Sequence, residues 1–480
     1  MAVARRFRGR GVVVALVVTA LFATLVAAGP AEAGAGAGGP HRDRPVDVRF
    51  SWMPGFDDPA TPDALDRVGV LRIGPRNARH VLVLSPGTSG GSAYFVPLAE
   101  DIVRRSHGRW QVWSVERREN QLEDQSVADQ VKRGEVGGQA SFDYYLGWIL
   151  DPTITHHFQP IPDADVAYAR GWGMNVEIED LHRVVLAAKR HHRTVVLGGH
   201  SLGGSITTAY ATWDFNGRPG ARDLAGLVYI DGGSNPTPIS EADATQALAN
   251  LQTSTPWLAF GGIPTPFLGL FSSGGALLAL KEPNAPSVGQ AFPLLPANIK
   301  VPVPATNLAQ FGYGTDTETS PPNLAAGQAH VGHLAASGDP RGWDQAGEIS
   351  PIERYATMLS GGDLLGVDGV AWYHPQRLTL DSRAVAAGNA NPAQAVLDVK
   401  AVHGHDLSHK LRIYAFGALG GAGVLASAQA LADQSGIPAG NLTLVNRQGT
   451  YAHNDPAAAS PQNDFLDALM PFLTGIGRHG

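Results

Sequence analysis

One serine of this chain stands between glycines in the segment Gly199–Gly203, which reads Gly-His-Ser-Leu-Gly, where a buried strand runs into a helix. Glycines at these places let the backbone turn sharply, so that the Ser201 hydroxyl projects from the turn while the helix packs close to the strand. A hydroxyl held in this way can attack a carbonyl carbon and form a covalent intermediate. The segment therefore predicts Ser201 as a nucleophile.

A second segment of the same pattern, Gly87–Gly91, also follows an apolar run and offers Ser89 as an alternative. The neighbouring elements favour Ser201. Apolar residues recur at helical spacing over 176–188, a strand is expected over 194–197, and a helix over 206–211 is followed by a buried strand at 227–230. This succession predicts a β-α-β unit with Ser201 at its first turn.

A histidine suited to activate that serine lies near the C-terminus. His453 stands in a loop that follows a strand-like segment at 442–445 and precedes a terminal helix, for which Ser460 is the expected cap and Pro461 the first turn. A neutral imidazole can take the serine proton and return it to the leaving group. We therefore predict His453 as the general base.

The Ser201 segment together with Gly204 resembles the nucleophile turn of the α/β-hydrolase superfamily, in its esterase and lipase branch. The resemblance extends from Arg79 to the C-terminus. It implies a mostly parallel central sheet flanked by helices, and catalysis by a Ser-His-Asp triad. It also implies that the oxyanion segment, the serine, the acid and the histidine follow one another in this order along the chain.

The acid departs from the commoner pattern of that superfamily. The usual place is just after the penultimate strand, here 411–416, which runs into 417–421 without any carboxylate. Asp231 ends the strand after the nucleophile helix, as in a minority of lipases and dehalogenases that the chain resembles here. Asp231 is therefore the predicted acid; Asp406 is the alternative, and a structural turn aspartate is the other reading of Asp231.

The resemblance implies an oxyanion hole made of two backbone N–H groups. Leu202, directly after the nucleophile, supplies one of them. The second maps onto the loop after the strand at 81–84, where Pro86-Gly87 replaces the commoner His-Gly, and Thr88 is the expected donor. The other interpretation of this loop is a glycine-rich turn into the next helix.

The first residues have the features of an export signal. Arginines in 5–10 precede an apolar run at 12–28 and an Ala-Glu-Ala site at 31–33, which predicts a signal peptide at 1–33 and secretion. The alternative is an uncleaved anchor. A flexible linker is expected at 34–45, and no later stretch is apolar enough to anchor the mature chain stably in a membrane.

The remaining length is predicted to form one α/β-hydrolase core with an insertion. The core is expected in two parts, 46–233 and 410–480, with a cap or lid at 234–409 inserted between them. Four aromatic residues of the insertion are expected to bind the apolar part of a substrate: Trp257, Phe260, Phe267 and Phe271. The alternative is that they form the small core of the cap itself.

The composition argues against several classes of binding partner and cofactor. The formal net charge is −7 and 16% of residues are charged, with no basic stripe, which argues against nucleic acid or an anionic membrane surface. The chain has no cysteine and so no disulfide. Two histidine clusters lack a full set of metal ligands, and neither a metal nor an organic cofactor is expected: His330 with His333, and His403 with His405 and His409.

These features together predict a secreted carboxylic ester hydrolase that forms an acyl-enzyme at Ser201. The expected substrate is a small-molecule or lipid-like ester with an apolar acyl or alcohol part. A secreted acyltransferase and a catalytically silent binding protein on the same fold are the alternatives. No sequence feature points to a protein partner.

Overall fold

The computed structural model describes residues 45–293 and 295–477. The predicted signal peptide at 1–33 and all of the predicted linker except Pro45 lie outside these residues. Within them, no helix combines the length and the apolar character needed to cross a membrane.

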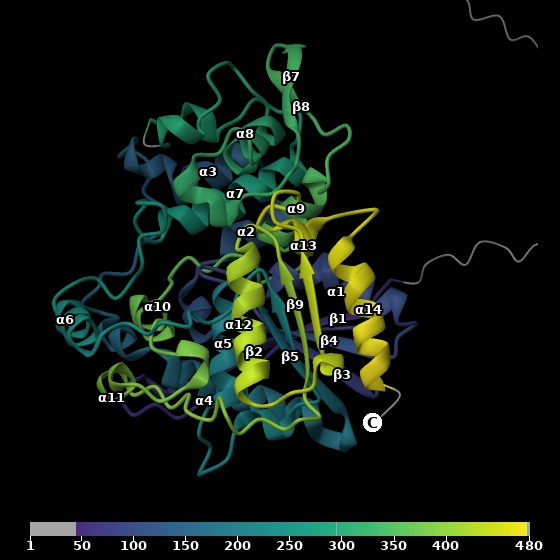
Figure 1. Cartoon of the computed structure of the whole chain (residues 1–480). Coiled ribbons are helices and arrows are strands. Elements are labelled where there is room, and N and C mark those ends of the chain that lie inside the picture. Colours follow the sequence, from purple (N-terminus) through teal and green to yellow (C-terminus); the bar gives the residue numbers. More distant parts are fainter. Residues whose placement is uncertain (1–44, 294, 478–480) are drawn as a thin grey trace, which may run out of the picture. The chain divides into compact units, whose positions relative to one another are not determined.

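The centre of the fold is an eight-stranded sheet in the order β1-β2-β4-β3-β5-β6-β9-β10 (Figure 1). β2 pairs antiparallel with β1 and β4, and every other neighbouring pair is parallel. The prediction of a mostly parallel central sheet is therefore confirmed. The strands are Val48–Pro54 (β1), Arg67–Ile73 (β2), His80–Ser85 (β3), Trp110–Glu116 (β4), Thr194–His200 (β5), Gly226–Ile230 (β6), Arg412–Gly417 (β9) and Leu442–Asn446 (β10).

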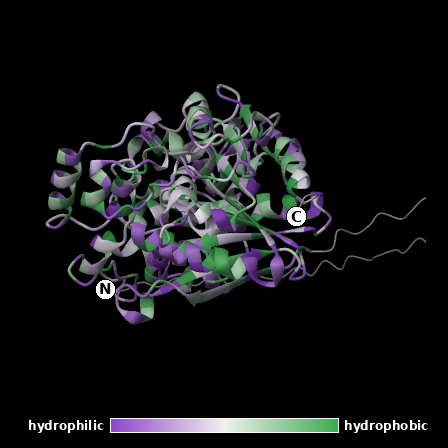
Figure 2. Cartoon of the chain, turned by 60° about the horizontal axis from the view of Figure 1, so that its bottom comes forward, coloured by the Kyte–Doolittle hydropathy of each residue, from purple (hydrophilic) through white to green (hydrophobic). Residues whose placement is uncertain are grey.

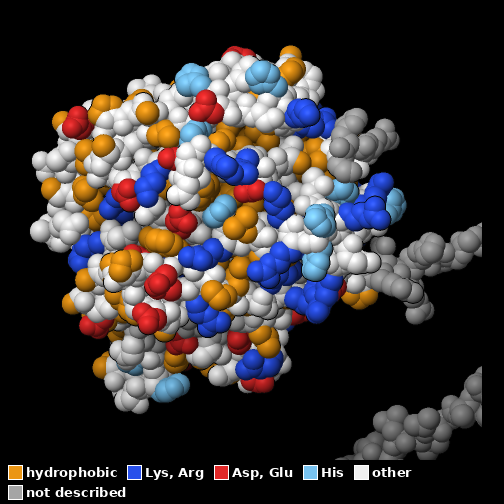
Figure 3. Space-filling model, turned by 90° about the horizontal axis from the view of Figure 1, so that it is seen from below, with side chains coloured by type: hydrophobic (Ala, Val, Ile, Leu, Met, Phe, Trp, Pro, Cys, Tyr) orange, Lys and Arg blue, Asp and Glu red, His pale blue; other side chains and the backbone are white. Residues whose placement is uncertain are grey.

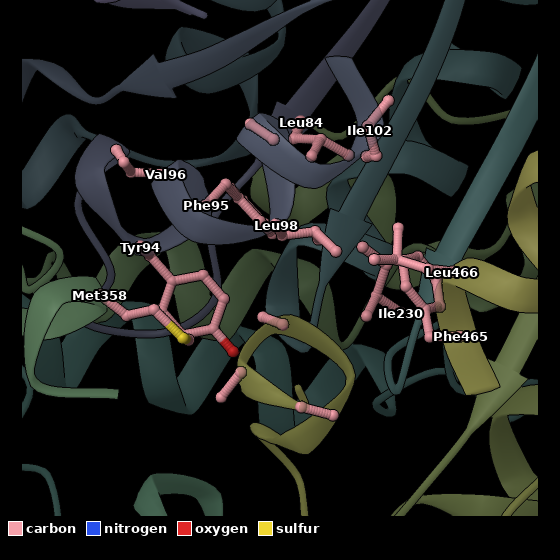
Figure 4. Close-up of a cluster of buried hydrophobic side chains, with 14 of the residues drawn as sticks. Leu84, Tyr94, Phe95, Val96, Leu98, Ile102, Ile230, Met358, Phe465 and Leu466 are labelled. Atoms are coloured by element: carbon pink, nitrogen blue, oxygen red, sulfur yellow. The ribbon is translucent and has the colours of Figure 1, made fainter. Parts of the chain in front are cut away.

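Helices cover both faces of this sheet because its central strands are apolar on both sides. Along β3, Leu82 and Leu84 join the hydrophobic cluster on one face, whereas Val81 and Val83 join the cluster on the other. The first face carries α1 (Val96–Arg105) and α14 (Asp464–Gly477), whose side chains surround Ile230 in Figure 4. The second face carries α4 (Met174–Lys189), α5 (Leu202–Thr212) and α12 (Gly421–Gln434).

Among the flanking helices α1 is amphipathic, with Leu98 and Ile102 buried and Arg104 and Arg105 exposed, whereas α5 is buried along its whole length. Figure 2 shows hydrophobic and hydrophilic residues both present among the helices. The predicted β-α-β unit is confirmed as β5, α5 and β6. The start of the last helix is corrected: α14 begins at Asp464, and the Asn463 side chain, rather than Ser460, accepts an N–H of its first turn. A short helix that the sequence pattern did not indicate, α13 (Asp455–Ala458), follows His453 directly.

The long segment between β6 and β9 divides into two groups of elements. In one group α10 (Gln376–Ser382) packs on α4 and α5, and α6 (Glu241–Leu251) packs on α10 and on α11 (Pro392–Leu397). The other lies beyond the carboxyl ends of the parallel strands, together with α2 (Ser126–Lys132) and α3 (Gly138–Tyr145), as Figure 1 shows. Its members are α7 (Phe267–Lys281), α8 (Asn307–Thr315), β7 (His333–Gly338), β8 (Arg341–Asp344) and α9 (Ile352–Ser360).

The opposite edge of the sheet, at the amino ends of the parallel strands, is rich in cations. His80 pairs in register with Trp110 on β4 and with Thr194 on β5, so Arg79, Arg109 and Arg193 immediately precede three adjacent strands. Lys, Arg and His side chains gather on this face in Figure 3. Burial and the two neighbouring cations Arg109 and Arg79 lower the pKa of His80.

Candidate active site

Ser201 occupies the tight turn between β5 and α5, with a backbone φ of 56° and ψ of −122°. A non-glycine residue rarely adopts a positive φ, and such a turn typically carries a functional side chain. The flanking glycines are required by space. A side chain at Gly199 would collide with the carbonyl oxygen of Gly203, and one at Gly203 would collide with that of Ser85. The predicted strand-turn-helix setting is confirmed.

The structure brings His453 and Asp231 together. His453 Nδ1 lies 2.6 Å from Asp231 Oδ2, and both side chains are buried. Asp231 ends β6 and also accepts N–H bonds from Ala418 at 2.6 Å and from Gly420 at 2.9 Å. The loop after β9, where the commoner pattern has its acid, therefore supplies donors to the acid instead.

The alternative acid lies elsewhere. Asp406 Oδ2 is 2.8 Å from His403 Nδ1, and 62% of its side chain is exposed. At Asp231, burial opposes ionisation, but the hydrogen bond and charge of His453 and the N–H of Ala418 outweigh it and lower the pKa of the carboxyl. Asp231 is thus ionised at neutral pH, as a group that must stabilise an imidazolium has to be.

Ser201 and His453 line one cavity. The second ring nitrogen of His453, Nε2, is buried, and no side chain or backbone group within 45–293 and 295–477 forms a hydrogen bond with it. Its partner nitrogen is fixed by Asp231, so Nε2 is the atom left to exchange a proton with a hydroxyl in the cavity.

The loop after β3 lies against the nucleophile. A Cβ placed on Gly87 would be 2.9 Å from the Cβ of Ser201, and Thr88 lines the cavity. In the described part of the chain, neither the Thr88 N–H nor the Leu202 N–H has a protein acceptor. Both predicted oxyanion donors are therefore available. Ser89, the alternative nucleophile, also lines this cavity but lies outside any strand-to-helix turn of the Ser201 kind.

The cavity has a volume of about 250 Å³ and opens to solvent, and its wall is mainly apolar. The structure places two of the four predicted aromatic residues, Phe260 and Phe271, at this wall. The other apolar lining residues are Phe142, Leu146, Leu268, Leu270, Leu278, Val288, Leu295, Ile299, Phe311, Leu324, Ala326, Leu359 and Val370.

The other two predicted aromatic residues are not at the wall, and the prediction of substrate contact is corrected for them. Trp257 is buried in a cluster, with its ring centroid 5.3 Å from that of Tyr373 and 6.3 Å from that of Trp172, and Phe267 packs against the same cluster. The cluster also contains residues of the segment 127–176, which lies outside the predicted insertion, so this pair belongs to a core shared with the rest of the chain and not to a small core of the cap itself.

Two residues that sequence reasoning missed hold the His453 backbone. The rings of Tyr94 and His200 stack with centroids 4.9 Å apart, and His200 Nε2 lies 2.9 Å from the carbonyl oxygen of His453. Burial lowers the pKa of His200 to about 3, so its neutral ring can donate this bond. The Tyr94 hydroxyl, directed toward the segment after His453 in Figure 4, donates to Asn454 at 2.8 Å. The place of His200 directly before Ser201 was the available signal.

A further carboxylate fixes the same loop to the segment between β6 and β9. Asp455 is fully buried; it accepts the Ser350 hydroxyl at 2.8 Å and the Ala452 N–H at 2.7 Å, and lies 2.5 Å from His330 Nδ1. This bond raises the pKa of His330. The first histidine cluster of the sequence is thus tied to a carboxylate. Across 45–293 and 295–477, no group of three or more His, Cys, Asp or Glu side chains is placed to hold a metal ion.

Comparison with known proteins gave structural likenesses only. No family model and no curated protein matches the chain. A structure of a lipase from Sulfolobus solfataricus, described as putative, is 14% identical, with 92% of this chain and 98% of that one covered and a TM-score of 0.45. A monoglyceride lipase from Saccharomyces cerevisiae is 10% identical, with 92% and 97% covered and a TM-score of 0.38.

A carboxyl esterase from Bacillus coagulans is 12% identical, with 89% of this chain and 98% of that one covered and a TM-score of 0.37. Independently of these likenesses, the mostly parallel sheet places Ser201 on a turn after β5, Asp231 after β6 and His453 after β10. Serine, acid and histidine in this chain order around such a sheet are the arrangement of the α/β-hydrolase fold, and the chain has this fold.

Proposed function

We propose that the chain is a serine hydrolase that cleaves carboxylic esters with an apolar acyl or alcohol part. The observation that carries the proposal is the buried His453–Asp231 pair at 2.6 Å, with Ser201 at the wall of the same apolar cavity as His453. A serine on this turn with an oriented imidazole beside it is the arrangement that activates a hydroxyl for acyl transfer.

In the proposed reaction the Ser201 Oγ attacks the ester carbonyl carbon while His453 Nε2 takes the hydroxyl proton. The Asp231 carboxylate holds the imidazole through Nδ1 and stabilises its positive charge. The oxyanion accepts the N–H groups of Leu202 and Thr88. As the intermediate collapses, the C–O bond to the alcohol breaks and His453 gives it the proton. Water, deprotonated by His453, then releases the acid and restores Ser201.

The lining of the cavity supports an apolar substrate. Burial of apolar surface yields about 25 cal/mol per Å², or about 0.8 kcal/mol for each methylene group. An alkyl chain along Phe260 and Phe271 would therefore bind better with each added carbon until the cavity is filled. With the signal peptide predicted at 1–33, we propose that this substrate is met outside the cell.

Hydrolysis of p-nitrophenyl esters from acetate to dodecanoate tests the proposal. We expect turnover by the full chain that improves with chain length, nearly complete loss in Ser201→Ala and a far smaller loss in Ser89→Ala. Adding an alcohol acceptor shows whether the acyl group goes to water or to the alcohol, which separates a hydrolase from an acyltransferase. If no ester is turned over and an alkyl fluorophosphonate does not label Ser201, the chain is a silent binding protein, and the proposal is contradicted.

A further inference from the structure

A buried arginine outside the triad binds the loop after β3, which lies against Ser201. Arg117 directly follows β4, and 1% of its side chain is exposed. Its Nη1 donates to the carbonyl oxygen of Pro86 at 3.0 Å, and its Nη2 donates to those of Gly87 at 2.8 Å and Gly90 at 3.0 Å. One guanidinium thus binds three carbonyl groups within five residues of the loop.

The bond to Gly87 sets the direction of the next N–H. In a trans peptide unit the carbonyl oxygen and the following N–H point in opposite directions across a rigid plane. The Gly87 oxygen faces Arg117, so the Thr88 N–H faces away from it. Gly87 packs against the Cβ of Ser201, and Thr88 lines the cavity. The hydrogen bond from Arg117 to the Gly87 oxygen therefore directs the Thr88 N–H away from the protein interior and toward the side on which Ser201 lies.

We propose that Arg117 is a positioning residue that holds the Thr88 N–H in place for the oxyanion of the reaction. This inference rests on the proposed ester hydrolysis, and it identifies the residue that fixes the position of one donor of the oxyanion hole. A rigid donor keeps its stabilising effect because no reorganisation is needed when the charge develops. Elsewhere the loop is held by the Ser89 carbonyl oxygen, which accepts the Ala371 N–H at 2.8 Å, and by the Gly90 N–H, which donates to the Gly87 oxygen at 3.2 Å. Arg117 binds the Gly87 oxygen itself, in the same peptide unit as the Thr88 N–H.

The residue type suits the task. A guanidinium carries five N–H donors in a planar fork and stays charged when buried. Arg117 uses this fork on the loop and, through Nε, on Glu119 at 2.8 Å. The compact ammonium of a lysine could not reach three carbonyl groups and a carboxylate at once. Because removal of Arg117 alone would leave Glu119 buried without its partner, a fair test must change both residues.

The double variant Arg117→Met/Glu119→Gln tests the proposal in the full chain. The neighbouring triple variant Arg118→Met/Asp66→Asn/Asp180→Asn is the matched control, since it also removes a buried arginine and its carboxylate partners, with atoms 2.8 Å apart, but none of them contacts the loop. Three quantities are measured: kcat and KM for an ester, affinity for an alkyl trifluoromethyl ketone, which becomes an oxyanion on the serine, and affinity for the matching methyl ketone.

We expect the Arg117 double variant to lower kcat and trifluoromethyl ketone affinity by about 10²-fold each, with KM and methyl ketone affinity changed less than about threefold. The control should change none of them beyond about threefold. Arg117→Lys, which keeps a charge beside Glu119, should fold and lose activity to an intermediate degree. If the double variant does not fold, Arg117→Lys replaces it, and the same three quantities are measured.

An active wild type whose Arg117 variants keep both kcat and trifluoromethyl ketone affinity would overturn this inference alone. Equal weakening of the two ketones would also overturn it, because the whole cavity and not the oxyanion donor would then have changed. A wild type that neither hydrolyses esters nor binds the trifluoromethyl ketone would overturn the proposed function, and this inference with it.

Discussion

Asp231 reaches His453 from a strand end that differs from the commoner one, and the pairing of β6 with β9 explains why this works. Ile230 stands opposite Phe416 in register, so the ends of the two strands are neighbours at one edge of the sheet. A carboxylate placed after either strand can therefore approach the same imidazole. With the acid after β6, the loop after β9 offers N–H groups that stabilise its charge.

Replacing this carboxylate by an amide measures its role. Asp231→Asn keeps the shape but removes the charge and favours the wrong histidine tautomer, so kcat should fall by about 10³ to 10⁴, or about 4 to 5.5 kcal/mol of barrier, with KM little changed. Steady-state kinetics at neutral pH, on protein shown to be folded by thermal unfolding, gives the answer.

Asp406→Asn is the matched control, because Asp406 pairs with His403 on an exposed surface. Its activity should stay near that of wild type. Loss of activity in Asp406→Asn together with near-normal activity in Asp231→Asn would move the acid to the loop before β9, and mild effects from both would leave a Ser-His dyad.

Among the elements, those fixed by local periodicity were predictable and those fixed by distant contacts were not. The strand with Val195 and Val196 and the helix after Ser201 follow from apolar spacing. The short α13 follows no such pattern, since it is held by the buried side chain of Asp455.

The role of single residues on α7 shows the same limit. Phe267 and Phe271 are one turn apart and equally apolar, and both pack against the same cluster of aromatic residues, yet of the two only Phe271 also lines the cavity. Only the position of α7 against the rest of the chain separates them. Apolar spacing cannot distinguish a pocket wall from a small core, which is why the sequence left both readings open.

This pair gives a controlled test of substrate selection. Phe271→Ala removes apolar surface from the cavity wall and should lower the ratio of kcat/KM for decanoate to that for butyrate by about tenfold. Phe267→Ala should lower thermal stability but leave this ratio within about twofold. The reverse result, or equal ratios in both variants, would mean that α7 is scaffold and does not contact the acyl chain.

The fold as a whole gathers charges that lie far apart in the sequence. Arg79, Arg109 and Arg193 immediately precede three adjacent strands although more than a hundred residues separate the first from the last, so composition gave no sign of a basic edge. Buried carboxyl groups were equally hidden. Burial raises the pKa of Glu116 to about 7 and that of Glu177, despite the attraction of Arg117, to about 8.

These raised pKa values predict how stability depends on pH. A carboxyl group that binds its proton more tightly when folded stabilises the protein fully below its unfolded pKa, and this contribution is lost as pH rises through the folded pKa. His200 and His374, whose pKa values burial lowers, act in the opposite sense around their unfolded pKa of about 6.5, and this smaller effect offsets part of the fall. Between pH 6.5 and 8 the free energy of unfolding should therefore fall, by about 2 kcal/mol.

Denaturant unfolding across this range checks the prediction. Glu177→Gln removes the carboxyl group with the higher of the two pKa values, so the free energy of unfolding should fall less between pH 6.5 and 8. Glu135→Gln should leave it unchanged, because Glu135 is exposed beside Arg133 and its pKa is lowered by that partner. A stability that rises from pH 6.5 to 8, or a slope that Glu177→Gln does not alter, would contradict the view that these carboxyl groups are buried in their protonated form.

The central claim is that Ser201 is a nucleophile activated by His453 and Asp231, and peptide mass mapping after reaction with an alkyl fluorophosphonate tests it most directly. We predict one covalent adduct per chain, on the peptide that contains Ser201, formed at neutral pH and slowed strongly in Asp231→Asn. An adduct on Ser89 instead, or no adduct on folded wild-type protein, would contradict the account.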